Sequence, residues 1–127
     1  MKTIVNTPEA PLPIGPYNQS VVFNNMLFVS GQIAIDPASG ELVLDSIEAE
    51  THRVLQNIEA VLKAAGSDLT KVLKATVFVK DMNMFGRINA IYGEYFKPEF
   101  APARELVQVS ELPKFVNIEI SVIAYTA

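Results

Sequence analysis

Apolar and polar residues follow one another along this chain in a pattern that predicts short strands separated by two helices. Two apolar runs in residues 18 to 30 flank Asn24-Asn25. Because asparagine tolerates the positive φ values of a tight turn, this segment is predicted to form two antiparallel strands. The stretch GQIAI that follows is expected to end in a turn at DPASG, where Pro37 and Gly40 interrupt regular structure.

A helix is predicted after this turn. It begins at a capping arrangement of Asp45 with Glu48 three residues later, and it stops at Gly66. Its apolar residues recur at the spacing of a single helix face: Val54, Leu55, Ile58, Val61, Leu62 and Ala65. The only histidine, His52, lies off this stripe, so we expect it to be solvated. Residues 72 to 79 are rich in β-branched side chains and predict a strand.

The last third of the chain predicts a second helix and two strands. The helix is expected to begin near Asn83 and to end before Pro98. One side of it carries Phe85, Ile88, Tyr92, Tyr95 and Phe96. Residues 104 to 109 and 116 to 124 predict two strands joined by a short loop around ELPK. This order of elements predicts an α+β fold with both helices on one face of a mixed sheet, formed by residues 1–127 as a single domain.

The predicted hairpin carries more apolar side chains than two helices can cover. The segment SVVFNNMLFVS is apolar at consecutive positions, as though both faces of its strands were buried. We therefore expect another copy of the chain to cover the face that lacks helices. The alternative is that these residues lie at strand ends in a sheet with a barrel-like curl.

The composition argues against several classes of function. With 127 residues, 50% of them hydrophobic, the chain can bury a real core, and without cysteine it has no disulfide, thiolate nucleophile or cysteine-bound metal. The net charge of −4 opposes binding to nucleic acid. The N-terminus lacks the apolar run of a signal peptide and no segment is long enough to span a membrane, so a cytoplasmic location is expected. An anionic substrate would need local donors, which draws attention to single arginines.

Strand alternation offers one such arginine. In residues 104 to 109 the two valines are expected to face the helices and Arg104 the other side. In residues 116 to 124 alternate apolar side chains face the core, which leaves Glu119 on the opposite side. If the two strands are antiparallel neighbours, Arg104 and Glu119 become cross-strand neighbours. The pair is then either a surface salt bridge or part of a functional site.

Five segments together resemble one family. They are IGPYNQ (14 to 19), VSGQIAIDPASGE (29 to 41), NIEAVLKAAGSDLTKVLKATVFVKDM (57 to 82), APAR (101 to 104) and LPKFVNIEISVIA (112 to 124). In this order and spacing they make essentially the whole chain resemble the RidA (YjgF/YER057c/UK114) family. The resemblance implies a chorismate-mutase-like α+β fold and a homotrimer with clefts between subunits. It also implies deamination, without cofactor or metal, of the enamines and imines that pyridoxal-phosphate enzymes release, such as 2-aminoacrylate and 2-aminocrotonate.

The resemblance also implies roles for the charged pair. Arg104 stands at the family's arginine position and would bind the substrate carboxylate through two parallel hydrogen bonds. Glu119 matches the family's glutamate, which would activate a water molecule and return its proton to the departing nitrogen.

Other positions match cleft-lining residues of the family. Tyr17 matches a tyrosine of the cleft, although a packing role is the alternative. Gly31 matches a glycine whose backbone lies beside the ligand, and the alternative there is a bulge. Phe85 and Asn89, one helical turn apart, resemble a cleft-lining pair, while Phe85 also fits the core stripe.

The chain departs from the family after PAR. Many members continue with Ser and then Cys, Ser or Thr, whereas this chain has Glu105 and Leu106. Leu106 shares the predicted face of Arg104, so only its main chain could position a water molecule. Glu105 points the other way and would either weaken anion binding or pair with a neighbouring subunit. Two further functions stay open: a non-catalytic regulatory module that binds small carboxylates, and a holdase.

Overall fold

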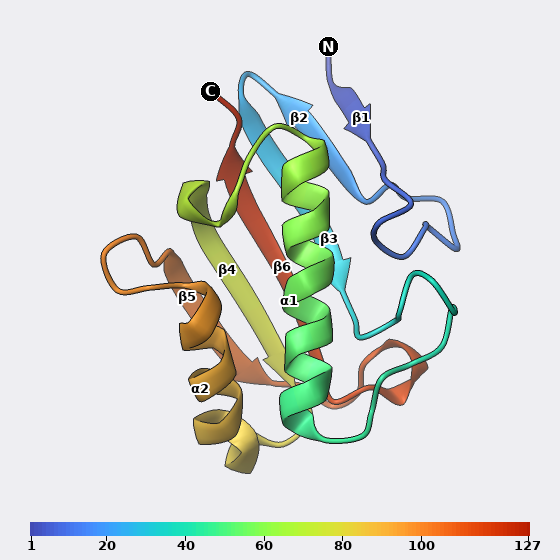
Figure 1. Cartoon of the computed structure of the whole chain (residues 1–127), viewed down its shortest axis with the longest axis vertical. Coiled ribbons are helices and arrows are strands. Elements are labelled where there is room, and N and C mark those ends of the chain that lie inside the picture. Colours follow the sequence, from blue (N-terminus) through green and yellow to red (C-terminus); the bar gives the residue numbers. More distant parts are fainter.

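One mixed sheet carries two helices on a single face (Figure 1). The computed structural model describes residues 1–127. Its strands and α-helices are β1 (Thr3–Val5), β2 (Ser20–Phe23), β3 (Met26–Gln32), α1 (Ile47–Ala64), β4 (Val72–Val79), α2 (Phe85–Tyr95), β5 (Ala103–Gln108) and β6 (Ile118–Tyr125). The predicted α+β class is confirmed, whereas the short strand β1 was not predicted. Neither helix is long and apolar enough to cross a membrane.

The strand order places β6 in the middle of the sheet. The order is β1-β2-β3-β6-β4-β5, so β6 pairs with β3 on one side and β4 on the other. All pairs are antiparallel except β4 with β5. A parallel pair needs a crossover connection, which α2 provides. The sheet has two edges, β1 and β5, and therefore does not close into a barrel.

The hairpin between β2 and β3 turns as the sequence predicts. Asn24 and Asn25 have φ values of 50° and 63°. Two consecutive positive φ values are those of a type I′ turn, whose twist matches the twist of the strands that it joins. The turn sets Phe23 opposite Met26, and the rest of the register follows from that pair.

Helix α1 matches its predicted stripe and differs at its cap. Val54, Leu55, Ile58, Val61 and Leu62 are each 0% exposed, while Ala65 is half-buried. The N-cap is Ser46 and not Asp45, because the Ser46 side chain accepts a hydrogen bond of 3.0 Å from the Ala49 N–H. Gly66, with a φ of 78°, ends the helix as predicted.

Helix α2 begins two residues later than predicted. A single 3-10 turn, Met82–Met84, comes first, and the Asp81 side chain caps it by accepting from the Asn83 N–H at 2.9 Å. Of the predicted stripe, Ile88, Tyr92 and Phe96 are buried, whereas Tyr95 is half-buried and Phe85 is 41% exposed. The helix ends at Tyr95, three residues before Pro98.

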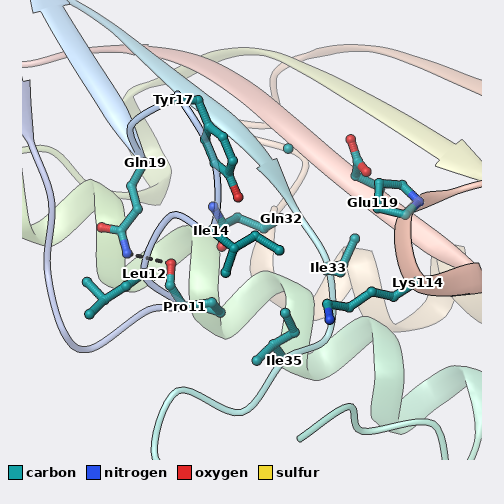
Figure 2. A pocket seen from close by; sticks show the side chains of 12 residues that line it. Pro11, Leu12, Ile14, Tyr17, Gln19, Gln32, Ile33, Ile35, Lys114 and Glu119 are labelled. Atoms are coloured by element: carbon teal, nitrogen blue, oxygen red, sulfur yellow. Dashed lines mark hydrogen bonds between the residues drawn. The ribbon is translucent and has the colours of Figure 1, made fainter. Parts of the chain in front are cut away.

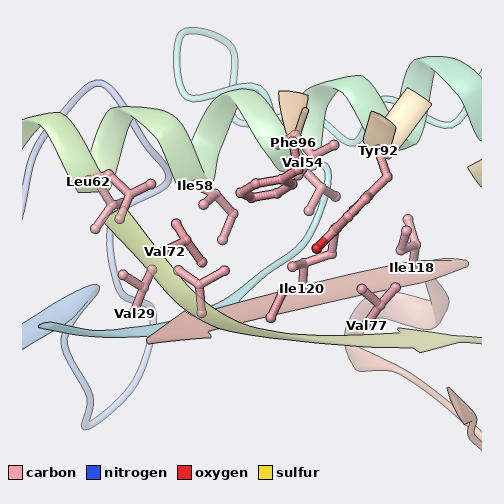
Figure 3. Packing of buried hydrophobic residues seen from close by; sticks show 14 of the residues in the cluster. Val29, Val54, Ile58, Leu62, Val72, Val77, Tyr92, Phe96, Ile118 and Ile120 are labelled. Atoms are coloured by element: carbon pink, nitrogen blue, oxygen red, sulfur yellow. The ribbon is translucent and has the colours of Figure 1, made fainter. Parts of the chain in front are cut away.

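The core lies between the helices and the sheet (Figure 3). On β6, Ile118, Ile120 and Val122 face it, which confirms the predicted alternation of that strand. The alternation predicted for β5 was wrong. Leu106 packs against the core on the helix side, and Val107 is 44% exposed on the other. Both residues are apolar and β5 is an edge strand, so its own sequence did not identify the inner face.

The face of the sheet without helices is apolar and open. Phe23, Phe28 and Val107 are 49%, 44% and 44% exposed there. The consecutive apolar positions of the hairpin therefore do supply side chains to both faces of the sheet, as predicted. That a second copy covers the open face stays a prediction.

Candidate active site

Glu119 stands on the open face of the sheet, at the central strand. Its neighbours along β6, Ile118 and Ile120, are fully buried on the helix side, so strand alternation turns the Glu119 side chain away from the core. The carboxyl is half-buried, and this burial raises its pKa above the usual value of a glutamate. A carboxyl with a raised pKa, held where a small molecule could reach it, is a candidate general acid and base.

A cavity of about 110 Å³ lies beside this carboxyl. Tyr17 and Lys114 line it together with Glu119 (Figure 2). The opposite wall is apolar and includes Leu12 and Ile14 from the N-terminal loop. A site of this kind has enough polar groups to orient a small molecule and enough apolar surface to exclude water.

Gly31 lies against Glu119. The pairing of β3 with β6 shifts between Val29 and Gln32, so Gly31 sits at an irregularity where β3 approaches the glutamate closely. A Cβ on Gly31 would lie 2.8 Å from the carboxyl carbon of Glu119 and nearer still to Oε2. The bulge and the close approach are thus the same feature, and any side chain at residue 31 would displace the carboxylate.

A second, buried glutamate holds the start of β6. Glu50 on α1 is 1% exposed, and its Oε2 accepts from the N–H groups of Asn117 at 2.8 Å and Ile118 at 3.2 Å. Its Oε1 accepts from Asn117 Nδ2 at 2.8 Å. Just before this point the loop passes through Lys114 and Phe115, whose φ values of 54° and 59° are unusual for residues other than glycine. Glu50 therefore fixes the path of the segment that carries Lys114 and Glu119. It was not identified from the sequence.

The guanidinium of Arg104 lies on the other face of the sheet, against α2. Its Nη1 donates to Asn89 Oδ1 at 2.8 Å. Its central carbon lies 4.7 Å from the ring centroid of Tyr92 and 5.8 Å from that of Phe85. Of the predicted cleft residues, Arg104, Phe85 and Asn89 are therefore together, and Leu106 lies two residues along the same face of β5.

The predicted contact between Arg104 and Glu119 within one chain was wrong. Strand β5 pairs in parallel with β4, and β4 separates it from β6. Through the ladder Arg104 shares a face with Ala75 and Val122, which are both buried under the helices, whereas Glu119 aligns with Phe78 on the open face. The predicted site residues thus form two half-sites: Arg104, Phe85, Asn89 and Leu106 on one face, and Glu119, Gly31 and Tyr17 on the other.

Two other expectations concern residues outside these half-sites. Glu105 points away from Arg104, as predicted, but it lies on the open face and not on the helix side, because the whole alternation of β5 is reversed. Its Oε1 pairs with Lys74 Nζ at 2.9 Å within the same chain. Its charge is therefore already balanced locally. His52 was expected to be solvated, but it is half-buried, and its Nδ1 is 2.9 Å from the Tyr95 hydroxyl. Tyr95 reaches across from α2, a contact that the pattern of a single helix could not reveal.

The structure has no group of three or more His, Cys, Asp or Glu side chains that could hold a metal ion. Chemistry without metal or cofactor stays a prediction. The fold and the half-sites define a class: a small α+β protein with an isolated half-buried carboxyl on one face of its sheet and an aromatic-lined guanidinium on the other.

Comparison with known proteins identifies the family. The sequence model of the Endoribonuclease L-PSP family matches residues 7–126. A RutC family protein of Pyrococcus horikoshii is 53% identical over 125 residues, which cover 98% of each chain. A bovine protein named 2-iminobutanoate/2-iminopropanoate deaminase is 45% identical over 124 residues, which cover 98% of this chain and 90% of the bovine one. The crystal structure of a Rid family protein of unknown function from Yersinia pestis matches with a TM-score of 0.95 and 46% identity, over 98% of this chain and 99% of that one.

The chain therefore belongs to the Endoribonuclease L-PSP family, which is the RidA (YjgF/YER057c/UK114) family. The resemblance inferred from its five sequence segments is confirmed.

Proposed function

We propose that this protein hydrolyses small 2-imino and 2-enamino carboxylates, such as the tautomers of 2-aminoacrylate and 2-aminocrotonate, to 2-oxo acids and ammonia. The observation that carries the proposal is the isolated, half-buried carboxyl of Glu119 beside a cavity, with burial as the only cause of its raised pKa. The name of the bovine relative, a 2-iminobutanoate/2-iminopropanoate deaminase, supports the same chemistry.

The reaction needs one proton-transfer group and one anchor. Glu119 takes a proton from water as the oxygen attacks the imine carbon, and a tetrahedral carbinolamine forms. The same carboxyl gives that proton to the nitrogen, which completes the carbinolamine. It then takes the proton of the new hydroxyl and delivers it to the amine, so that the C=O bond forms as the C–N bond breaks, and ammonia leaves a 2-oxo acid behind. Arg104 binds the substrate carboxylate through donors that Asn89 leaves free, because only Nη1 is used in that hydrogen bond. Holding the carboxylate places the imine carbon at a fixed distance from the base.

Since Arg104 and Glu119 occupy opposite faces of one sheet, a complete site requires two copies of the chain. We place the site between neighbouring subunits of a homotrimer, with the carboxylate half from one copy and the acid–base half from the next. The open apolar face that carries Phe23, Phe28 and Val107 supports such an assembly. A monomer in light scattering at micromolar concentration would refute it.

Mixed trimers test the shared site directly. Glu119→Gln keeps the shape but loses the base, so its homotrimers should bind carboxylates and release no ammonia from 2-aminoacrylate generated in situ. Arg104→Gln homotrimers should be inactive for lack of the anchor. Refolded together, the two variants should regain activity, because a cyclic mixed trimer has about one intact site in three. If mixing restores nothing, the residues do not meet between subunits, and if Glu119→Gln alone stays fully active, the glutamate is structural.

Leu106 favours a second candidate, a non-catalytic module that binds small carboxylates. Its side chain is half-buried, packs against the core and offers no polar group beside Arg104. If the main chain at residue 106 positions the water, Leu106→Ser should change the rate constant less than about tenfold, roughly 1.4 kcal/mol. A wild type that is silent on 2-aminoacrylate, together with a Leu106→Ser variant that gains activity, would make the binding module the better explanation.

The net charge of −4 still argues against nucleic acid as the substrate, whatever the family is called. Incubation with single-stranded RNA under the same conditions is the appropriate control, and we expect the RNA to remain intact.

A further inference from the structure

Helix α2 presents a row of three side chains to the guanidinium of Arg104. Phe85, Asn89 and Tyr92 follow one another at intervals of four and three residues, so they lie on one face of the helix. Asn89 accepts one hydrogen bond from Nη1, and the two rings lie within 6 Å of the central carbon of the guanidinium. The ring of Tyr92 is the nearer of the two rings, with its centroid 4.7 Å from the central carbon of the guanidinium.

Burial separates Tyr92 from the other two. Phe85 is 41% exposed and Asn89 is exposed as well, so both side chains can change rotamer in solvent. Tyr92 is 6% exposed, and its ring packs on that of Phe96 with the centroids 4.7 Å apart. Figure 3 shows it reaching from α2 toward Ile120 on the sheet. Because the ring is held in the core, its face attracts a cation at one fixed place only.

The hydroxyl of Tyr92 does not explain why the ring is there. It is buried without a hydrogen-bond partner. Burial raises the pKa of this phenol to about 12, so the group stays neutral near pH 7 and offers Arg104 no anionic partner. Leaving a buried hydroxyl unpaired costs free energy. The contact that remains between the two residues is therefore that of the ring face with the cation.

We propose that Tyr92 is a positioning residue: its buried ring is the rigid floor that holds the Arg104 guanidinium in place for a substrate carboxylate. The proposal rests on the proposed function for the identity of the ligand. An arginine side chain loses considerable rotamer entropy when it binds a ligand. A ring that already restricts the side chain in the free protein lowers this entropic cost of binding. The hydrogen bond to Asn89 then fixes how the guanidinium is rotated within its plane, while the ring of Tyr92 fixes the orientation of that plane.

Three variants separate the ring from the hydroxyl and from general packing. Tyr92→Phe keeps the ring and removes the unpaired hydroxyl. Tyr92→Leu removes the ring and keeps an apolar side chain, and Tyr92→Met takes its place if that variant does not fold. Phe96→Leu is the matched control, because it removes a neighbouring buried ring that does not face the guanidinium.

Two measurements follow, one of which needs no ligand. In the free protein, nitrogen relaxation of Arg104 Nε reports the mobility of the guanidinium. Calorimetry with 2-oxobutanoate, the stable 2-oxo acid that hydrolysis of 2-aminocrotonate would give, reports the affinity of the anchor. We expect Tyr92→Phe to match the wild type in both. Tyr92→Leu should loosen Nε and raise Kd about tenfold, equivalent to about 1.4 kcal/mol. Phe96→Leu should melt at a lower temperature with Nε and Kd unchanged.

The outcomes distinguish this inference from the proposed function. If Nε is as ordered in Tyr92→Leu as in the wild type, or if Phe96→Leu loosens it equally, Tyr92 is only a core residue and the inference is overturned. If wild-type protein does not bind 2-oxobutanoate, the proposed function loses its anchor, while the relaxation of Nε still decides whether Tyr92 positions the guanidinium.

Discussion

Gly31→Ala is the smallest change that should separate the position of Glu119 from the stability of the fold. The new Cβ would lie 2.8 Å from the carboxyl carbon, whereas ordinary contacts begin at 3.4 Å. The carbon must therefore retreat by about 0.6 Å, and Oε2, which is nearer, by more. The φ of Gly31 lies outside the left-handed region, so alanine can adopt the same backbone. The end of a flexible side chain, and not the strand, has to move.

The two consequences of this substitution differ greatly in size. A misplacement of roughly 1 Å in a catalytic group costs on the order of 100-fold in rate, equivalent to about 2.7 kcal/mol. The carboxylate makes no ion pair that the movement would break, and it remains beside the same cavity. We therefore expect kcat/KM on 2-aminoacrylate to fall about 100-fold while the melting temperature stays within about 3 °C of the wild-type value.

The assay couples ammonia release to a second enzyme and is paired with a melting curve for each protein. Gly93→Ala is the control, because a Cβ there meets nothing within 4 Å. Gly93 lies in the last turn of α2, so that substitution should raise stability by at most about 1 kcal/mol and leave the rate unchanged. Full activity of a folded Gly31→Ala protein would refute the reasoning, because the reaction would then tolerate a displaced Glu119.

Three other predictions follow, two for the carboxyl groups of Glu119 and Glu50 and one for the N-cap of α1. Burial raises the pKa of Glu119 above 4.5, so the folded chain binds this proton more tightly than the unfolded chain does, and the stability of the wild type falls as the pH rises through these pKa values. Glu119→Gln should therefore be more stable than the wild type at pH 8 and should lose that advantage below about pH 4. Glu50→Ala should lose about 3 kcal/mol in urea unfolding, since it leaves the buried Ile118 N–H and the two Asn117 donors without their acceptor. Glu50→Gln should keep most of the stability, and an equal loss in both variants would contradict this. Ser46→Ala should lose about 1 kcal/mol and Asp45→Ala almost nothing, and the reverse order would move the cap back to Asp45.

Elements with strong local signals were predictable from the sequence. The hairpin follows from two asparagines that tolerate positive φ, and α1 follows from a stripe at helical spacing that ends at a glycine. Strand β6 follows from strict alternation, because it is central and only one of its faces is covered by the helices. In each case the determining residues lie within about ten positions of one another, where local physics decides.

The site was harder because its geometry depends on distant pairing. The sequence offers β5 and β6 as consecutive strands joined by a short loop, and consecutive strands usually neighbour each other. Here β4 lies between them, and only its register with β5 determines which way Arg104 points. Glu50 was missed for the same reason: on a helix it looks solvated, and its partners lie 67 and 68 residues away. Tyr92 was predicted only as a core residue, which it also is.

The position of Arg104 on an edge strand has a consequence for local unfolding. Strand β5 is hydrogen-bonded to β4 alone, whereas β6, which carries Glu119, is bonded on both sides. Segments with fewer bonds and contacts open at lower free energy than the core does, so the amides of β5 should exchange with solvent before those of β6. The anchor and the base of the proposed site therefore belong to parts of the molecule that open independently, and the guanidinium can leave its place against α2 while the carboxylate stays fixed in the centre of the sheet.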